Sequence, residues 1–230
     1  MNRVDYRLNA IIDGALRPLG NLAEMAGIAA RNGATIIQYR DKEASTREMI
    51  AEAEAIRAAL AGTDVPLVVN DRVDVALAAG ADGIHIGRDD MQAETARRLL
   101  GPDAIIGLTV KNEADADAAI AAPIDYACIG GVFETLSKKN PDAPVGLEGF
   151  RALRARIRAA KPGLPVGAIA GIDVPRTAQV VQAGASGVAV ISAIFRAADI
   201  AAATRELRAA VDSAAGRARD GAADDAGDRP

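Results

Sequence analysis

The sequence has no tryptophan, few other aromatic residues, one histidine and one cysteine. Aromatic residues make up 3% of the 230 residues, which argues against the stacking platforms that bind single-stranded nucleic acid. The single cysteine, Cys128, excludes a disulfide within the chain and is typical of a protein from a reducing compartment. No spacing typical of a zinc site, a catalytic Ser-His-Asp set or a dinucleotide-binding glycine motif is present.

An excess of positive charge and long apolar runs are also lacking. The 27 Lys and Arg residues and 31 Asp and Glu residues give a net charge of -4, which argues against broad electrostatic binding to nucleic acid or an anionic membrane. Charges at Arg3, Asp5, Arg7 and Asp13 interrupt any signal-peptide core. No uncharged apolar stretch reaches the roughly 20 residues of a membrane helix. We expect a soluble cytoplasmic protein with small-molecule substrates, and we leave a homo-oligomer open.

Short apolar runs alternate with alanine-rich amphipathic stretches along most of the chain. Such runs are typical of strands that are buried on both faces, and strand–helix alternation predicts parallel βαβ units. The predicted strands are residues 7–12, 35–40, 66–70, 83–87, 105–110, 126–132, 166–169 and 187–191. The predicted helices lie near residues 21–32, 45–61, 72–79, 91–100, 112–121, 147–160, 174–183 and 199–214.

Eight such units predict a single (β/α)8 TIM barrel over residues 1–215. A doubly wound open sheet is the alternative, because the pattern alone does not establish closure of the barrel. Residues 216–230 have no apolar periodicity, and we expect them to form a disordered tail.

The end of the second predicted strand carries an amide and two cations. A period of two places Gln38, Arg40 and Lys42 on one side of this strand if it persists that far. Because catalytic groups of parallel barrels lie after the carboxyl ends of the strands, this pattern favours an anion site, such as one for a phosphate ester. A solvated loop is the alternative interpretation.

Two carboxylates follow the next two predicted strands. Asp71 follows the third strand and Asp90 the fourth, and neighbouring parallel strands lie about 4.8 Å apart. The pair could therefore hold Mg²⁺, which takes one or two carboxylates together with phosphates and waters. Because both residues also stand just before predicted helices, capping of the helix N-termini is an equal alternative.

Hydroxyls, glycines and lysines follow the remaining strands. Thr109 ends the fifth strand, and the loop at 130–139 combines a glycine pair, two hydroxyls and a lysine pair. Small residues after the seventh and eighth strands would let backbone N–H groups approach a phosphate, the usual arrangement in this architecture. Inside the predicted strands, His85 is interpreted as a buried, hydrogen-bonded residue and Cys128 as a small core residue.

These segments together resemble the thiamine-phosphate synthase family. The resemblance covers about residues 5–210 and rests on seven motifs in order: QYRDK (38–42), NDRVD (70–74), ADGIHIGRDD (81–90), GLTV (107–110), TLSKK (135–139), AIAGI (168–172) and GVAVIS (187–192). It implies a (β/α)8 barrel that uses Mg²⁺ to join a hydroxymethylpyrimidine diphosphate to a thiazole phosphate, or to its carboxylated form, with release of diphosphate.

The resemblance also implies a role for each matching residue. Arg40, Lys42 and Lys138 would act on the diphosphate, which makes them the expected catalytic groups. Asp71 and Asp90 would be the Mg²⁺ ligands. The expected substrate contacts are Gln38, Arg40, Lys42 and Asn70 on the pyrimidine diphosphate side, Thr109 where the family usually has serine, Lys138 at the diphosphate, and Thr135, Ser137, Gly171, Ile191 and Ser192 on the thiazole phosphate side.

Three departures from the family pattern lie on the thiazole side. Gly131 stands where the family usually has proline, Ser137 where it has threonine, and Ala170 where it has glycine. The changes at Gly131 and Ala170 favour one alternative, a catalytically silent homologue that binds thiazole phosphate. A thiazole tautomerase of the same superfamily is the other alternative, and the retained diphosphate and metal residues favour the synthase over it: Gln38, Arg40, Lys42, Asn70, Asp71 and Asp90. An unrelated sugar-phosphate isomerase would need an acid/base pair at the rim, and the sequence offers no clear one.

Overall fold

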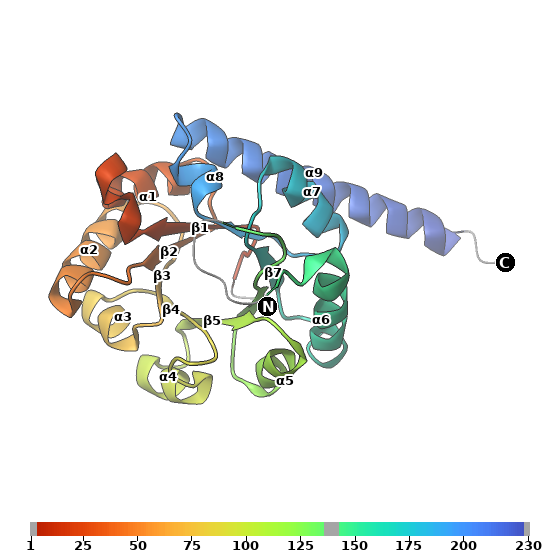
Figure 1. Cartoon of the computed structure of the whole chain (residues 1–230), viewed down its shortest axis with the longest axis horizontal. Coiled ribbons are helices and arrows are strands. Elements are labelled where there is room, and N and C mark those ends of the chain that lie inside the picture. Colours follow the sequence, from red (N-terminus) through yellow and green to blue (C-terminus); the bar gives the residue numbers. More distant parts are fainter. Residues whose placement is uncertain (1–3, 136–142, 228–230) are drawn as a thin grey trace.

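The computed structural model describes residues 4–135 and 143–227. Its strands form a closed parallel barrel in which each strand pairs with the next and β8 pairs with β1 (Figure 1). The predicted (β/α)8 TIM barrel is confirmed, and the open sheet is excluded because Leu8 of β1 pairs with Val188 of β8. The strands are β1 (Leu8–Asp13), β2 (Ile36–Arg40), β3 (Leu67–Asn70), β4 (Gly83–Ile86), β5 (Ile105–Val110), β6 (Tyr126–Ile129), β7 (Val166–Ile169) and β8 (Val188–Val190).

Helices surround the barrel on its outside (Figure 1). They are α1 (Leu22–Arg31), α2 (Thr46–Ala59), α3 (Val73–Ala79), α4 (Ala93–Leu100), α5 (Glu113–Ala121), α6 (Gly146–Ala160), α7 (Val174–Gln182), α8 (Ser192–Phe195) and α9 (Ile200–Gly227). The short α8 and a 3-10 helix, η1 (Gly14–Leu19), were not predicted, because each is too short for a periodic pattern.

Polar side chains cap several of these helices. Ser45 and Glu48 form a reciprocal capping box at α2, and Asn21, Asn112 and Asp173 each accept a backbone N–H bond at the start of α1, α5 and α7. The start of α3 and that of α4 have no such side-chain bond.

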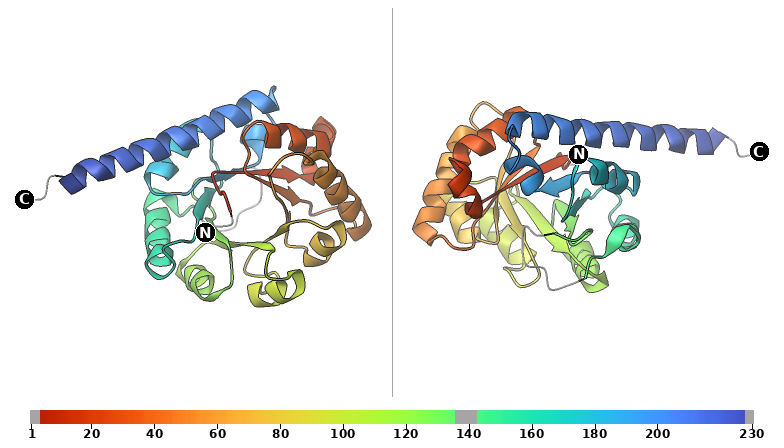
Figure 2. Two further views of the ribbon diagram at one scale, coloured as in Figure 1. Left: turned by 180° about the vertical axis from the view of Figure 1, so that it is seen from behind. Right: turned by 45° about the horizontal axis from the view of Figure 1, so that its top comes forward.

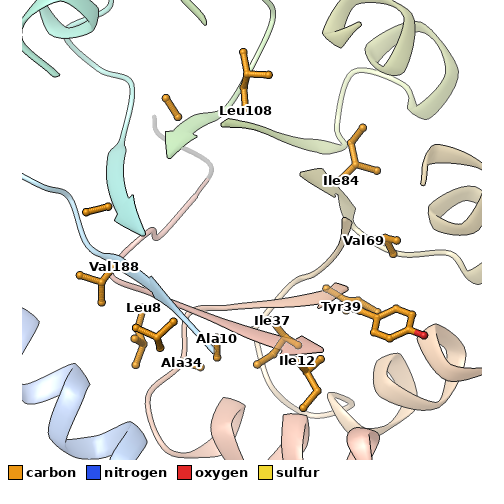
Figure 3. Close-up of a cluster of buried hydrophobic side chains, with 14 of the residues drawn as sticks. Leu8, Ala10, Ile12, Ala34, Ile37, Tyr39, Val69, Ile84, Leu108 and Val188 are labelled. Carbon is orange, nitrogen blue, oxygen red and sulfur yellow. The ribbon is translucent and has the colours of Figure 1, made fainter. Parts of the chain in front are cut away.

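The larger hydrophobic core lies between the strands and the helices. Outward-facing strand residues such as Leu8, Ile12, Ile37 and Ile84 are fully buried there (Figure 3). Burial of both faces of the strands explains why they read as continuous apolar runs in the sequence.

A smaller cluster fills the barrel itself at the amino ends of the strands. The rings of Tyr6 and Tyr126 lie 4.7 Å apart between centroids. Each ring lies against a glycine: a Cβ added at Gly167 would lie 1.8 Å from the Tyr6 ring, and one at Gly107 would lie 2.0 Å from the Tyr126 ring. The two tyrosines therefore fill the interior at this end of the barrel, and the cavity lies toward the carboxyl ends of the strands.

The final helix projects beyond the barrel (Figure 2). Its backbone continues to Gly227, so the structure has a helix over most of the segment for which the sequence predicts disorder. The alanine content of this segment provides the physical reason, because alanine has the highest intrinsic helix propensity. Among the described residues, none of the helices combines the length and the apolar character needed to cross a membrane.

Candidate active site at the carboxyl ends of the strands

A cavity of about 700 Å³ opens inside the barrel at the carboxyl ends of the strands. Its volume is in the range of sites for small molecules. Eight of the predicted site residues line it, and they come from six of the strands or the loops that follow them: Gln38, Arg40, Asn70, Thr109, Thr135, Gly171, Ile191 and Ser192. Closure of the barrel therefore brings together residues that lie far apart in the sequence.

The cationic edge of the cavity begins at β2. The guanidinium of Arg40 forms an ion pair with Asp13, at the end of the neighbouring strand β1. Asp13 also caps η1 by accepting the N–H of Ala15 at 2.9 Å. Because the carboxylate is itself held in place, Arg40 is fixed at the rim of the cavity rather than free in solvent. Gln38 lies two residues before Arg40 on the same side of β2, and it is 2% exposed.

Lys42, Asp71 and Asp90 form a connected group beside the cavity. Lys42 forms an ion pair with Asp71, and the Asp71 carboxyl is close enough to Asp90 for a hydrogen bond between them. Burial and the neighbouring Asp71 raise the pKa of Asp90 to about 6. The backbone N–H of Gly87 donates to Asp90 at 2.7 Å, which fixes the carboxyl against the loop after β4. The predicted pairing of the two carboxylates is therefore present in the geometry.

The alternative that these carboxylates cap helices is wrong. The N-cap of α3 is Arg72 and that of α4 is Gln92, and neither helix receives a side-chain cap bond. Asp71 instead has a positive φ of 64°, a left-handed conformation that is uncommon outside glycine and is concentrated at functional sites.

A buried hydrogen-bond chain supports Thr109 from inside the barrel. Nε2 of His85 lies 2.8 Å from the Thr109 hydroxyl, and Nδ1 lies 3.0 Å from the Tyr126 hydroxyl. His85 is 7% exposed, so its interpretation as a buried, hydrogen-bonded residue is confirmed. It also lines the cavity, so its ring fixes the orientation of a hydroxyl at the site. Cys128 is buried in the inner cluster, as predicted.

The opposite side of the cavity is built from the loops after β6 and β7. Phe133 N–H donates to the carbonyl of Ala170 at 3.3 Å, and a Cβ added at Gly171 would lie 2.2 Å from the carbonyl oxygen of Glu134. Only glycine fits at this close approach. Arg176 joins the two loops, since it donates to the Gly171 carbonyl at 2.7 Å and lies 4.9 Å from the centroid of the Phe133 ring.

The departures from the family pattern have local consequences here. Gly131 has a φ of 73°, which proline cannot adopt because its ring fixes φ near −65°. Ala170 has a φ of 88°, which is strained for a residue with a Cβ. Ser137 and Lys138 lie outside the described residues.

The sequence analysis missed several residues that line the cavity. Asn9, Arg176 and Arg196 are the most informative, because each brings a polar or charged group to the wall. A period of two in the first strand would have placed Asn9 inside the barrel. The two arginines follow the seventh and eighth strands, where a cation is useful near a phosphate, but nothing in the sequence separates them from ordinary surface arginines.

A family model described as thiamine monophosphate synthase matches residues 8–194. This match covers the barrel and all strand ends that form the cavity. The chain belongs to the thiamine monophosphate synthase family.

Relatives within the thiamine monophosphate synthase family cover nearly the whole chain. A thiamine-phosphate synthase of Agrobacterium fabrum is 66% identical over 214 residues, which cover 93% of this chain and 97% of the relative. A thiamine-phosphate synthase of Chloroflexus aurantiacus is 44% identical over 208 residues, which cover 90% of this chain and 94% of the relative. The solved structure of thiamine phosphate pyrophosphorylase from Pyrococcus furiosus has a TM-score of 0.80 and 38% identity and covers 92% of this chain and 98% of its own.

Proposed function

We propose that this protein is a Mg²⁺-dependent thiamine-phosphate synthase. It joins a hydroxymethylpyrimidine diphosphate to a thiazole phosphate and releases diphosphate. The observation that carries the proposal is the convergence of eight family-matched residues on one cavity, beside a pair of carboxylates. Membership of the family and the high identity to thiamine-phosphate synthases support it.

The donor set beside the cavity fits Mg²⁺. Asp71 and Asp90 bring two carboxyl groups within hydrogen-bond reach of each other, an arrangement whose repulsion a cation would relieve. Among the described residues, no group of three or more His, Cys, Asp or Glu side chains is arranged so that it could hold a metal ion. Two carboxylates suit Mg²⁺, which commonly takes its other ligands from substrate phosphates and water. When bound, the ion would neutralise charge on the diphosphate.

The residues of the chain supply positioning and electrostatic stabilisation. Departure of the diphosphate breaks the bond between its oxygen and the methylene carbon of the pyrimidine, and both bonding electrons leave with the oxygen. Arg40 and Lys42 stabilise this growing negative charge. The thiazole nitrogen then donates its lone pair to the same carbon. Because that nitrogen carries no proton, the step requires no general base.

The thiazole phosphate is assigned to the opposite side of the cavity. Thr135, Gly171, Ile191 and Ser192 match the family residues for this phosphate and line the same wall. Holding both substrates in one cavity converts their encounter into a step between neighbouring groups, which is a large source of rate enhancement.

The test mixes the protein with pyrimidine diphosphate, thiazole phosphate and Mg²⁺ and measures thiamine phosphate by mass. We expect product that disappears on chelation of the metal. Asp71→Asn and Asp90→Asn should each lower turnover at least about 100-fold. The matched control is Asp89→Asn, which removes the same charge from the exposed neighbour of Asp90 and should retain full turnover.

Two results would contradict the proposal. Binding of thiazole phosphate without any product would favour the silent homologue. Full turnover of both Asp71→Asn and Asp90→Asn would show that the metal assignment is wrong.

A further inference from the structure

Asn9 buries an amide group that has no partner. Its side chain on β1 is fully buried, and neither Oδ1 nor Nδ2 has a hydrogen-bond partner among the described residues. Tyr6 is the only other described residue with such a buried unpaired side-chain atom. Burial of an unpaired polar group is costly and rare in folded proteins. We therefore expect a bound ligand to supply the hydrogen-bond partner of the Asn9 amide.

Asn9 lines the cavity at its deep end. In the sheet register Asn9 lies opposite Ile36 of β2 and Ala189 of β8. Arg40 lies four residues farther along β2, a distance of roughly 13 Å along the strand. The amide is therefore at the floor, and the cations are at the rim.

The surroundings of Asn9 are uncharged. Ile11, Cys128 and Ala189 line the cavity near it and belong to the buried inner cluster. His85 has hydrogen bonds at both ring nitrogens. Phosphate groups therefore belong at the rim, where the arginines are, and a neutral ring belongs at the floor.

A carboxamide presents one acceptor and one donor side by side. An aminopyrimidine has the complementary edge, with a ring nitrogen that accepts and an adjacent amino group that donates. Asparagine pairs in this bidentate way with the amino group and ring nitrogen of adenine. The thiazole ring has no N–H donor, so it would leave the Asn9 oxygen unpaired.

We propose that Asn9 is a specificity-determining residue, whose carboxamide binds the aminopyrimidine edge of the diphosphate substrate at the floor of the barrel. This inference rests on the proposed function. It adds a contact from β1, a strand to which the family resemblance assigns no role.

The competing explanation is a purely structural pairing of Asn9 with Tyr6. The Tyr6 hydroxyl lies within hydrogen-bond reach of Asn9, and this contact opposes the rise in the pKa of Tyr6 that burial causes. A small movement of either side chain could join them. Tyr6→Phe removes the hydroxyl and keeps the ring that packs on Gly167, so it serves as the matched control for any substitution of Asn9.

The experiment measures binding of pyrimidine diphosphate and thiazole phosphate to the wild type, Asn9→Leu and Tyr6→Phe. We expect Asn9→Leu to weaken pyrimidine diphosphate binding about 30-fold and to change thiazole phosphate binding less than about twofold. Its melting temperature should equal or exceed that of the wild type, because leucine removes an unpaired buried amide. Tyr6→Phe should bind both substrates as the wild type does.

A second probe is the pyrimidine diphosphate with hydrogen in place of the amino group, measured as a competitive inhibitor. Binding is compared because the amino group also affects the chemical step. The wild type should bind this analogue much more weakly than the amino compound, and Asn9→Leu should bind the two nearly equally. The four affinities, of two proteins for two ligands, form a thermodynamic cycle that isolates the contact between the Asn9 amide and the amino group. If Asn9→Leu does not fold, Asn9→Ala carries the same comparison.

Unchanged binding of pyrimidine diphosphate by the Asn9 variant would overturn the inference. If the Asn9 variant bound both substrates equally more weakly, that result would overturn it as well. So would an equal preference for the amino compound over its analogue in the wild type and in the variant. Failure of the proposed function is seen separately, as the absence of thiamine phosphate with the wild-type protein.

Discussion

Lys42 and Asp71 form an ion pair that joins the end of β2 to the loop after β3. The lysine ammonium thus contacts one of the two carboxylates proposed to hold Mg²⁺. Lys42 is half-exposed and the Asp71 side chain is mostly buried, so the lysine can move away while the carboxylate stays in place.

We expect Lys42→Met to separate metal binding from catalysis. Loss of the ammonium removes a competitor for Asp71, so the Mg²⁺ concentration for half-maximal activity should not rise. Loss of its charge near the diphosphate should lower kcat/KM about 100-fold. Mg²⁺ titrations of initial rates test both points. Arg47→Met, which removes the same charge from an exposed position on α2, should behave as the wild type; a wild-type rate for Lys42→Met would contradict this role.

His85 and Thr109 should act as one unit. Since Nε2 of His85 lies 2.8 Å from the Thr109 hydroxyl, His85→Leu should release this hydroxyl and lower kcat/KM about 10-fold, as should Thr109→Val. The double variant should lose little more than either single one. Fully multiplicative losses would show that the two residues act independently.

Ala170→Gly should raise the stability of the protein. The φ of 88° at Ala170 is strained, and its relief should outweigh the greater flexibility of glycine in the unfolded chain, for a net gain of up to about 1 kcal/mol. Ala168→Gly is the matched control two residues earlier, within strand β7, where φ is not positive. It should lower the free energy of unfolding by about 1 kcal/mol. Denaturant unfolding of the two variants measures the difference, and equal destabilisation would argue against strain at Ala170.

Asp41 should make stability depend on pH. Its buried carboxylate accepts N–H bonds from Glu43 at 2.9 Å and Ala44 at 3.0 Å and pairs with Arg17 at 2.6 Å. Burial opposes ionisation, but these partners outweigh it and lower the pKa of Asp41 below its usual 3.8. The stabilisation is therefore complete above pH 3.8 and is lost as pH falls through the lower folded-state value.

We accordingly expect Asp41→Asn to cost about 2 kcal/mol at pH 7. The difference from the wild type should begin to shrink as pH falls below 3.8 and should be smallest below the lowered pKa of folded Asp41, where both chains carry an uncharged side chain at this position. Urea unfolding at pH 7 and pH 3 compares them. A difference that stays constant over this range would contradict the role of the charge.

The positions of the strands could be predicted because each is a short apolar run bounded by polar residues. Six predicted residues lie in the carboxyl-terminal half of a strand or in the loop that follows it: Gln38, Arg40, Asn70, Asp71, Asp90 and Thr109. The rule that parallel barrels place their chemistry at this edge predicted that they lie near one another. The sequence could not separate a cation site from a helix cap at Asp71 and Asp90, because both need a carboxylate before a helix. The structure excluded the helix cap, because Arg72 and Gln92 occupy the N-cap positions of α3 and α4.

The sequence by itself determined the order of strands and helices and the residues at the strand ends, since both follow from local periodicity and local chemistry. Only the tertiary structure decided which side chains meet one another inside the barrel. Closure of β8 on β1 buries Asn9 without a partner, and it seats Tyr6 against Gly167, which lies far away in the sequence. Such contacts depend on the register of all eight strands around a closed ring, and no local pattern encodes that register.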